Sequence, residues 1–223
     1  MKPVLVFDVN ETLLDLKALD PIFEDILGDA AIRQQWFSQF IQNTFVSIIT
    51  DSYQPFGKIG ISALEMIASR KGITLKEDDK VKISEGVMHL PAHSEVYDAL
   101  RELKGAGFRM VTLTNSTTEV GKAQIKNANL EEYFDEILSA GTIKKLKPAK
   151  EAYQYAAKEL NIELKEMMLI AAHAWDIAGA LEAGCMAAFI ARPGAVLNPL
   201  AKHPHVQGKD LEEVANKIIQ LYK

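Results

Sequence analysis

The sequence is poor in cysteine, in long apolar runs and in charge of one sign. Its single cysteine, Cys185, excludes an intramolecular disulfide and is typical of the reducing cytoplasm, where we expect this chain to act. No apolar run approaches the ~20 residues of a membrane span, so we expect no membrane association. A net charge of −5 disfavours attraction to nucleic acid. These absences leave a small molecule as the expected partner.

Short apolar runs alternate with amphipathic segments along most of the chain. Five runs predict strands buried on both faces of a sheet: 3–9, 108–115, 136–141, 167–172 and 186–191. Apolar residues recur with helical spacing in 94–107, 118–130, 149–160, 175–184 and 210–223. Strands that alternate with helices indicate βαβ units. We therefore predict an α/β fold with a Rossmann-like, doubly wound parallel sheet.

One long segment interrupts this alternation. Between residues 16 and 90 the sequence predicts no strand and three helical stretches, 32–51, 60–72 and 77–90. A block of helices inserted directly after the first strand predicts a cap over the carboxyl edge of the sheet, where open α/β sheets bind ligands. We expect a core domain of residues 1–15 and 91–223 and a helical cap domain of residues 16–90.

Polar residues follow the predicted strands at their carboxyl ends. They are Asp8, Asn10 and Thr12 after the first strand, Thr114 and Asn115 at the end of the second, Lys147 beyond the third, and His173 and Asp176 after the fourth. Because parallel strands end at one edge of a sheet, we expect these side chains to converge. Two carboxylates with a lysine and hydroxyls favour covalent catalysis by an aspartate. Cys185, in an apolar segment, is instead expected to be a buried structural thiol.

The order of these motifs resembles the haloacid dehalogenase superfamily over essentially the whole chain. The motifs are FDVNETLLD, then TNS, then KP and finally WD, with an insert after the first. Within the superfamily, FDVNETLLD, KPAKEAY and AAHAWDIAGA most resemble the type II (L-2-)haloacid dehalogenases. The resemblance implies a core with a cap, a hydrolase that acts on carbon–halide bonds, and a homodimer.

Two absences distinguish this sequence from the phosphatases of that superfamily. Phosphatases carry a second aspartate two residues after the nucleophile, where this chain has Asn10, which cannot act as an acid. They also carry a Gly-Asp pair that supplies a Mg²⁺ ligand, where this chain has Ala171 and Ala172. A departing halide needs no proton, and displacement at carbon needs no metal. Both absences favour dehalogenation with no metal or other cofactor.

The resemblance implies a catalytic role for four residues. Asp8 attacks the α-carbon of a 2-haloacid and expels halide, and water hydrolyses the resulting ester to give a 2-hydroxy acid. Lys147 balances the negative charge of Asp8 and the substrate, and Thr12 hydrogen-bonds Asp8 or its neighbours. Asp176 positions or activates the hydrolytic water, together with His173.

The resemblance also implies a set of substrate-binding residues. Thr114 and the backbone amide after it hold the substrate carboxylate, and Tyr153 matches a family tyrosine near the lysine. Asn10, Asn115 and His173 complete the set at the sheet edge. The family places a halide-binding arginine on the first long cap helix, where counting gives Asn43, and no arginine occurs between residues 34 and 69. A neutral amide binds a halide more weakly than a charged group.

Two other functions remain open on the sequence alone. One is a phosphatase that holds Mg²⁺ through Asp8, the Asn10 carbonyl, Asp176 and water. The other is a non-catalytic protein that binds a small carboxylate or a partner protein, and the missing arginine is its main support.

Overall fold

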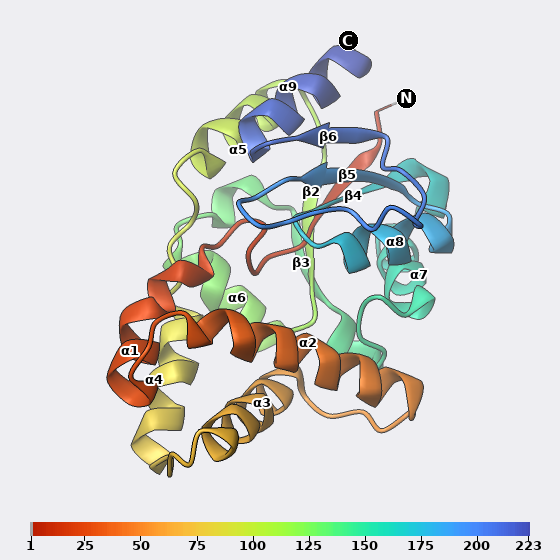
Figure 1. Cartoon of the computed structure of the whole chain (residues 1–223). Coiled ribbons are helices and arrows are strands. Elements are labelled where there is room, and N and C mark those ends of the chain that lie inside the picture. The colour runs from red at the N-terminus through yellow and green to blue at the C-terminus, as the bar shows by residue number, and fades with distance from the viewer. Residues whose placement is uncertain (1) are drawn as a thin grey trace.

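The computed structural model describes residues 2–223, which form a six-stranded parallel sheet in the order β3-β2-β1-β4-β5-β6 (Figure 1). The strands are β1 (Val4–Phe7), β2 (Met110–Thr114), β3 (Glu136–Ser139), β4 (Met167–Ala171), β5 (Met186–Ile190) and β6 (Val206–Gly208). All five pairings are parallel. The doubly wound α/β prediction is confirmed. Strand β6 was not predicted, because three residues give too short a pattern to detect.

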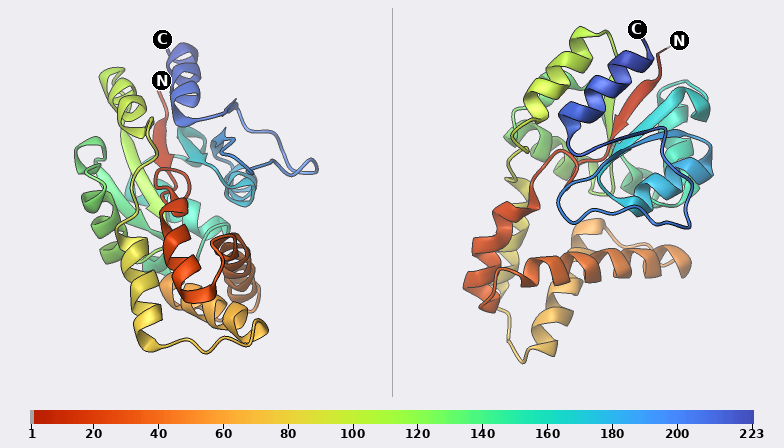
Figure 2. Two further views of the ribbon diagram at one scale, coloured as in Figure 1. Left: turned by 60° about the vertical axis from the view of Figure 1, so that its left-hand side comes forward. Right: turned by 45° about the horizontal axis from the view of Figure 1, so that its top comes forward.

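Helices cover both faces of the sheet (Figures 1 and 2). They are α5 (Val96–Gly105), α6 (Thr118–Asn127), α7 (Lys150–Glu159), α8 (Ala174–Ala183) and α9 (Leu211–Leu221). Successive residues of β1 point to opposite faces, as the pleat requires. Leu5 and Phe7 pack in one core cluster, and Val4 and Val6 in the other. Four short 3₁₀ helices complete the core and its connections: η1 (Leu16–Leu19), η2 (Glu131–Tyr133), η3 (Ala140–Ile143) and η4 (Leu164–Glu166).

The remaining helices group together beyond the sheet and form its cap (Figures 1 and 2). They are α1 (Asp20–Leu27), α2 (Ile32–Ile49), α3 (Phe56–Arg70) and α4 (Glu77–Met88). Helix α1 was not predicted, although Pro21 in its first turn and Gly28 at its left-handed C-cap, with φ of 78°, are start and stop signals. This grouping supports the proposed division into a core and a cap of residues 16–90.

Aromatic side chains hold α2 against α3. The indole N–H of Trp36 donates to the Gly60 carbonyl oxygen at 2.8 Å. Phe40 and Phe56 pack with their ring centroids 4.2 Å apart. A Cβ at Gly60 would lie 3.0 Å from the Phe40 ring, so the close approach of the two helices requires glycine there.

Two expectations from composition can be compared with the structure. Cys185 is buried, and burial together with the Asp176 charge raises the pKa of its thiol to about 12, which confirms an inert buried thiol. None of the helices within residues 2–223 combines the length and apolarity that a bilayer crossing requires.

Candidate active site

The loop after β1 turns back so that Thr12 lies beside Asp8. The backbone N–H groups of Leu13 and Leu14 both donate to the Val9 carbonyl oxygen, at 2.9 and 3.1 Å, which closes a tight turn. The Thr12 hydroxyl then donates to Oδ2 of Asp8 at 2.8 Å and accepts a hydrogen bond from the Ala172 N–H at 3.0 Å. The turn therefore ties β1 to β4, at the point where the strand order of the sheet reverses.

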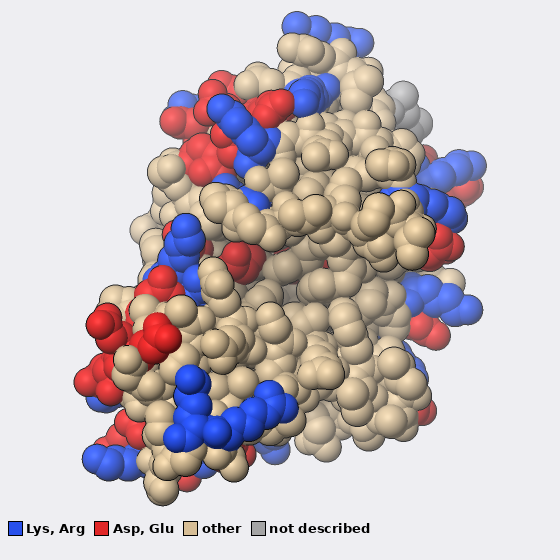
Figure 3. All heavy atoms as spheres, viewed as in Figure 1, with Lys and Arg blue, Asp and Glu red and all other residues tan. Residues whose placement is uncertain are grey.

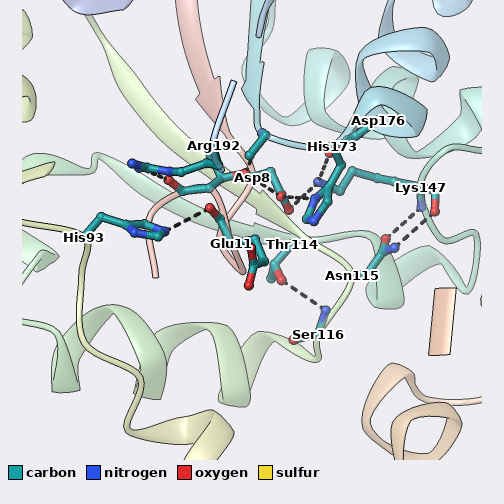
Figure 4. A network of polar contacts seen from close by, with 12 residues as sticks. Asp8, Glu11, His93, Thr114, Asn115, Ser116, Lys147, His173, Asp176 and Arg192 are labelled. Carbon is teal, nitrogen blue, oxygen red and sulfur yellow. Dashed lines mark hydrogen bonds and ion pairs between the residues drawn. The ribbon is translucent and has the colours of Figure 1, made fainter. Parts of the chain in front are cut away.

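Lys147 lies between two carboxylates (Figure 4). Its ammonium is 3.0 Å from Oδ1 of Asp8 and 2.6 Å from Oδ2 of Asp176. The Lys147 and Asp176 side chains are 0 % exposed and that of Asp8 is 8 % exposed. Asp8 directly follows β1, Lys147 lies in the loop before α7, and Asp176 lies in the first turn of α8. The structure brings these three residues together, as the sequence led us to expect.

The pKa values of the two carboxylates shift in opposite directions. Burial alone would raise the pKa of Asp8, but the Lys147 charge and the His173 hydrogen bond outweigh it and lower that pKa below its usual range. Burial raises the pKa of Asp176, which also faces the charge of Asp8. The two carboxylates raise the pKa of Lys147 although burial opposes this. Asp8 is therefore an ionised carboxylate beside a protonated lysine, which is the state that a nucleophile needs.

Tyr153 orients Asp176 and does not contact the substrate space. Its hydroxyl donates to Oδ1 of Asp176 at 2.6 Å, and the whole residue is 0 % exposed. Burial and the Asp176 charge raise its pKa well above the usual value, so it remains a donor. The expected substrate contact of Tyr153 is thus not present in the structure, because helix α7 directs its side chain into the core.

Asn115 fixes the loop that carries Lys147. Its side-chain amide donates to the Lys147 carbonyl oxygen at 3.1 Å and accepts from the Lys147 N–H at 2.7 Å. Both ends of the amide are used, so Asn115 acts through Lys147 and not on the substrate. Thr114 is buried, and its hydroxyl oxygen accepts the Ser116 N–H at 3.1 Å, which shapes the same strand end (Figure 4).

His173 and Lys147 contact different oxygens of the Asp8 carboxylate. Its Nδ1 lies 3.1 Å from Oδ2 of Asp8 and acts as the donor to this carboxylate. The imidazole is enclosed between two rings, those of Trp175 at a centroid distance of 5.1 Å and Phe37 at 5.4 Å. Its Nε2 is buried and has no hydrogen-bond partner within residues 2–223. A buried nitrogen without a partner is available to a water or a substrate atom.

Asn10 lies at the boundary between core and cap. Its Oδ1 accepts a hydrogen bond from Nε2 of Gln124 at 2.9 Å, and the same nitrogen donates to the Val87 carbonyl oxygen of α4 at 2.9 Å. Gln124 was not identified from the sequence, although it is a fully buried amide on a core helix. Such amides need internal partners. The structure shows that these partners join the nucleophile loop to the cap.

Asn43 lies apart from this group. Its side-chain amide contacts Met66 Sδ at 3.3 Å and accepts a hydrogen bond from Gln39 at 2.8 Å, between α2 and α3. These contacts engage the Asn43 side chain away from Asp8. Phe37, nearly two turns earlier on α2, is the residue of this helix that faces His173.

A cavity of about 480 Å³ lies where the cap meets the carboxyl edge. Asn10, Ser116 and Thr117 line it from the core, and Trp36, Phe37, Phe40, Phe56, Ile83 and Val87 are among its cap residues. Figure 3 shows a hollow between the upper and lower halves of this face, with mainly uncharged residues around it and acidic atoms at one margin. The cavity approaches the nucleophile loop through Asn10, two residues after Asp8.

The donor set around Asp8 does not fit Mg²⁺. The Lys147 ammonium already occupies the position between the Asp8 and Asp176 carboxylates, and it would repel a divalent cation there. Ala171 and Ala172 supply no side-chain oxygen next to Asp176. Within residues 2–223, no three His, Cys, Asp or Glu side chains gather closely enough to hold a metal ion.

Comparison with known proteins assigns the family. The sequence model of haloacid dehalogenase-like hydrolases matches residues 3–184, which include Asp8, Lys147 and Asp176. The chain belongs to the haloacid dehalogenase-like hydrolase family. It is therefore a hydrolase, as the motifs predicted.

Named relatives of this haloacid dehalogenase-like hydrolase align with it over most of their length. The chain is similar to an (S)-2-haloacid dehalogenase of Pseudomonas fluorescens, with 24% identity over 96% of this chain and 95% of the relative. It is also similar to (S)-2-haloacid dehalogenase 1 of Pseudomonas sp. (strain CBS-3), with 29% identity over 78% of each chain. A solved L-2-haloacid dehalogenase of Xanthobacter autotrophicus, with chloropropionic acid covalently bound, shares the fold. Its TM-score is 0.90 at 19% identity, over 98% of both chains.

Arg192 also stabilises the active-site loop of this family member, although it was not identified from the sequence. Arg192 donates to the Thr12 carbonyl oxygen at 2.8 Å and pairs with Glu95. It thereby fixes the turn that presents Thr12 to Asp8 (Figure 4). Arg192 follows β5 by two residues and so lies at the same edge of the sheet as the other site residues. This position in the sequence could have identified it.

Proposed function

We propose that this protein is a metal-independent 2-haloacid dehalogenase that forms an ester on Asp8. The observation that carries the proposal is the Lys147 ammonium, which hydrogen-bonds both Asp8 and Asp176 at the carboxyl edge of the sheet. A lysine in this position keeps the nucleophile ionised and occupies the place of a metal. The names of the relatives, (S)-2-haloacid dehalogenases, support the same activity.

The first step is displacement at carbon. An oxygen of the Asp8 carboxylate attacks C2 of the substrate, a new C–O bond forms, and the halide departs with the electron pair of the C–X bond. Lys147 stabilises the combined negative charge of Asp8 and the substrate carboxylate. Thr12 and His173 hold Oδ2 of Asp8, which fixes the orientation of the nucleophile.

The second step is hydrolysis of the ester. Water adds to Cγ of Asp8, the bond between Cγ and the ester oxygen breaks, and the 2-hydroxy acid leaves while Asp8 is restored. The water must lose a proton, and His173 and Asp176 are the two bases beside Asp8 that can accept it. Nε2 of His173 is the nitrogen without a partner, which favours His173 as the group that positions this water.

The departing halide meets aromatic rings and one imidazole. The nearby guanidinium groups are already held, Arg33 by Asp20 and Arg192 by Glu95. We assign the halide to the space beside the His173 and Phe37 rings. This replaces the assignment to Asn43.

The enzyme is also proposed to be a cytoplasmic homodimer. The single buried thiol fits a reducing compartment. Val46 and Ile49 on α2 are 52% and 83% exposed and offer an apolar contact for a second copy. Sedimentation equilibrium of the wild type and of Ile49→Glu tests the dimer, and a wild-type monomer at micromolar concentration would contradict it.

Halide release in the presence of a chelator tests the proposed reaction. Purified protein is incubated with 2-chloropropionate in excess EDTA, and chloride is measured. Asp8→Asn, which has the same shape but no nucleophilic carboxylate, is the control. We expect chloride release by the wild type and none by Asp8→Asn. Release of phosphate from an aryl phosphate only when Mg²⁺ is added, with no chloride release, would support the phosphatase alternative instead.

A further inference from the structure

The cavity next to Asp8 is larger than a short haloacid needs. Its volume is about 480 Å³, within the roughly 300–1,000 Å³ of pockets that enclose drug-sized ligands. A haloacid of two or three carbons would leave most of this space to water. The volume therefore indicates a substrate with a substantial group attached to the reacting carbon.

The lining of the cavity indicates what kind of group this is. Four aromatic rings, those of Trp36, Phe37, Phe40 and Phe56, form its cap side, and the Trp36 N–H is already bonded to the Gly60 carbonyl. Water in such a space finds few hydrogen-bond partners. An apolar group that replaces this water is stabilised by the hydrophobic effect.

One end of the cavity is lined by neighbours of the catalytic residues, and the other end by exposed residues of the cap. Its inner end is formed by Asn10, two residues after Asp8, and by Ser116. The Phe37 ring lines the cavity and also packs against the His173 ring. His173 in turn hydrogen-bonds Asp8. At the far end Glu65 on α3 and Ser84 on α4 are exposed. An extended chain attached at C2 can thus run from the nucleophile to an opening between these two helices.

We infer that the natural substrate is a 2-haloacid with an apolar substituent of roughly five to eight carbons on C2. This inference rests on the proposed dehalogenase function and names the substrate class of the same site. The carboxylate and the C–X bond lie at the inner, polar end, near Asn10 and Ser116. The substituent lies along the aromatic side of the cavity.

A chain-length series tests the inference. Bromide release is measured with racemic 2-bromopropanoate, 2-bromohexanoate and 2-bromooctanoate. Each buried methylene contributes at most about a fourfold gain. We expect kcat/KM for 2-bromooctanoate to exceed that for 2-bromopropanoate by at least about tenfold. A constant or falling kcat/KM along the series would overturn the inference.

Two tryptophan variants on one helix show whether the cavity causes this preference. Val87 on α4 lines the cavity, whereas Val81 on the same helix is 52% exposed and does not line it. We expect Val87→Trp to fill the cavity and to reduce the ratio of kcat/KM between the long and short substrates to near one. Val81→Trp, the matched control, is expected to keep the wild-type ratio. An unchanged ratio in folded Val87→Trp would overturn the inference.

A binding measurement separates this inference from the proposed reaction. Asp8→Asn protein is titrated with octanoate and with propanoate by calorimetry, which requires no turnover. We expect octanoate to bind at least about tenfold more tightly. Bromide release from 2-bromopropanoate without any preference for octanoate would contradict the substrate class and leave the dehalogenase function intact. Preferential octanoate binding without halide release from any substrate would contradict the reaction and support the apolar site.

Discussion

The ammonium of Lys147 lies 3.0 Å from Oδ1 of Asp8, with both side chains almost completely removed from solvent. Opposite charges this close and this deeply buried depend strongly on each other, because water does not screen them. A second carboxylate, Asp176, contacts the same ammonium. The arrangement makes Lys147 a structural group and, under the proposed function, a catalytic one.

Lys147→Met is expected to destabilise the protein. The variant leaves the Asp8 and Asp176 carboxylates buried without a cation, and breaking a buried pair costs about 3–5 kcal/mol. Urea unfolding measures the loss. The double variant Lys147→Met/Asp176→Asn removes one of the two uncompensated charges and should recover part of it. A Lys147→Met protein as stable as the wild type would contradict the burial of this charge cluster.

His173→Asn is expected to slow ester hydrolysis more than ester formation. Removing a positioned base lowers the rate of its step by about 10²–10⁴-fold. The variant should therefore release one equivalent of halide rapidly and then accumulate protein that carries the acid as an ester. Intact-mass spectrometry detects this species. Unchanged turnover in His173→Asn, with ester accumulation in Asp176→Asn, would assign the proton transfer to Asp176 instead.

Tyr153→Phe tests whether Tyr153 positions Asp176 or binds the substrate. Loss of the 2.6 Å hydrogen bond should cost about 1–2 kcal/mol of stability and lower kcat about tenfold. KM should remain near the wild-type value, because Tyr153 is fully buried and its hydroxyl is bound to Asp176. The control is Tyr155→Phe on the same helix, which should have no effect on kcat. A raised KM at constant kcat would indicate direct substrate contact.

The Cys185 thiol is expected to resist alkylation in the folded protein. Burial raises its pKa to about 12, so the reactive thiolate is scarce at pH 8. The rate of reaction with iodoacetamide should be far lower in the native protein than in urea, and should rise with pH up to about 12. Equal rates in the native and unfolded protein at pH 8 would show that the thiol is accessible.

Much of the fold and the centre of the site could be predicted from the sequence. The five longer strands are apolar runs, and Asp8, Lys147 and Asp176 stand next to such runs in an order that resembles a known superfamily. Local patterns decide these features, because strand ends at one edge must converge whatever the details of packing.

The roles of several polar residues could not be predicted, because they depend on tertiary partners. Asn115 looks like a substrate ligand by position, yet both ends of its amide bind the Lys147 backbone, 32 residues away in the chain. Asn43 was placed by counting along a helix, and a helix turns by about 100° per residue, so a shift of a few residues changes the face. Gln124 has no motif around it, and only the packed structure shows its link between Asn10 and the cap.

A single turnover in ¹⁸O-labelled water tests the ester on Asp8 most directly. Enzyme in excess over 2-chloropropionate reacts once, and the protein and the product are analysed separately by mass spectrometry. Because water adds to Cγ of Asp8, the account predicts ¹⁸O in the peptide that contains Asp8 and an unlabelled 2-hydroxyl group in the product. Label in the hydroxyl group of the product, with none in the protein, would mean that water attacks the substrate directly and would contradict the nucleophilic role of Asp8.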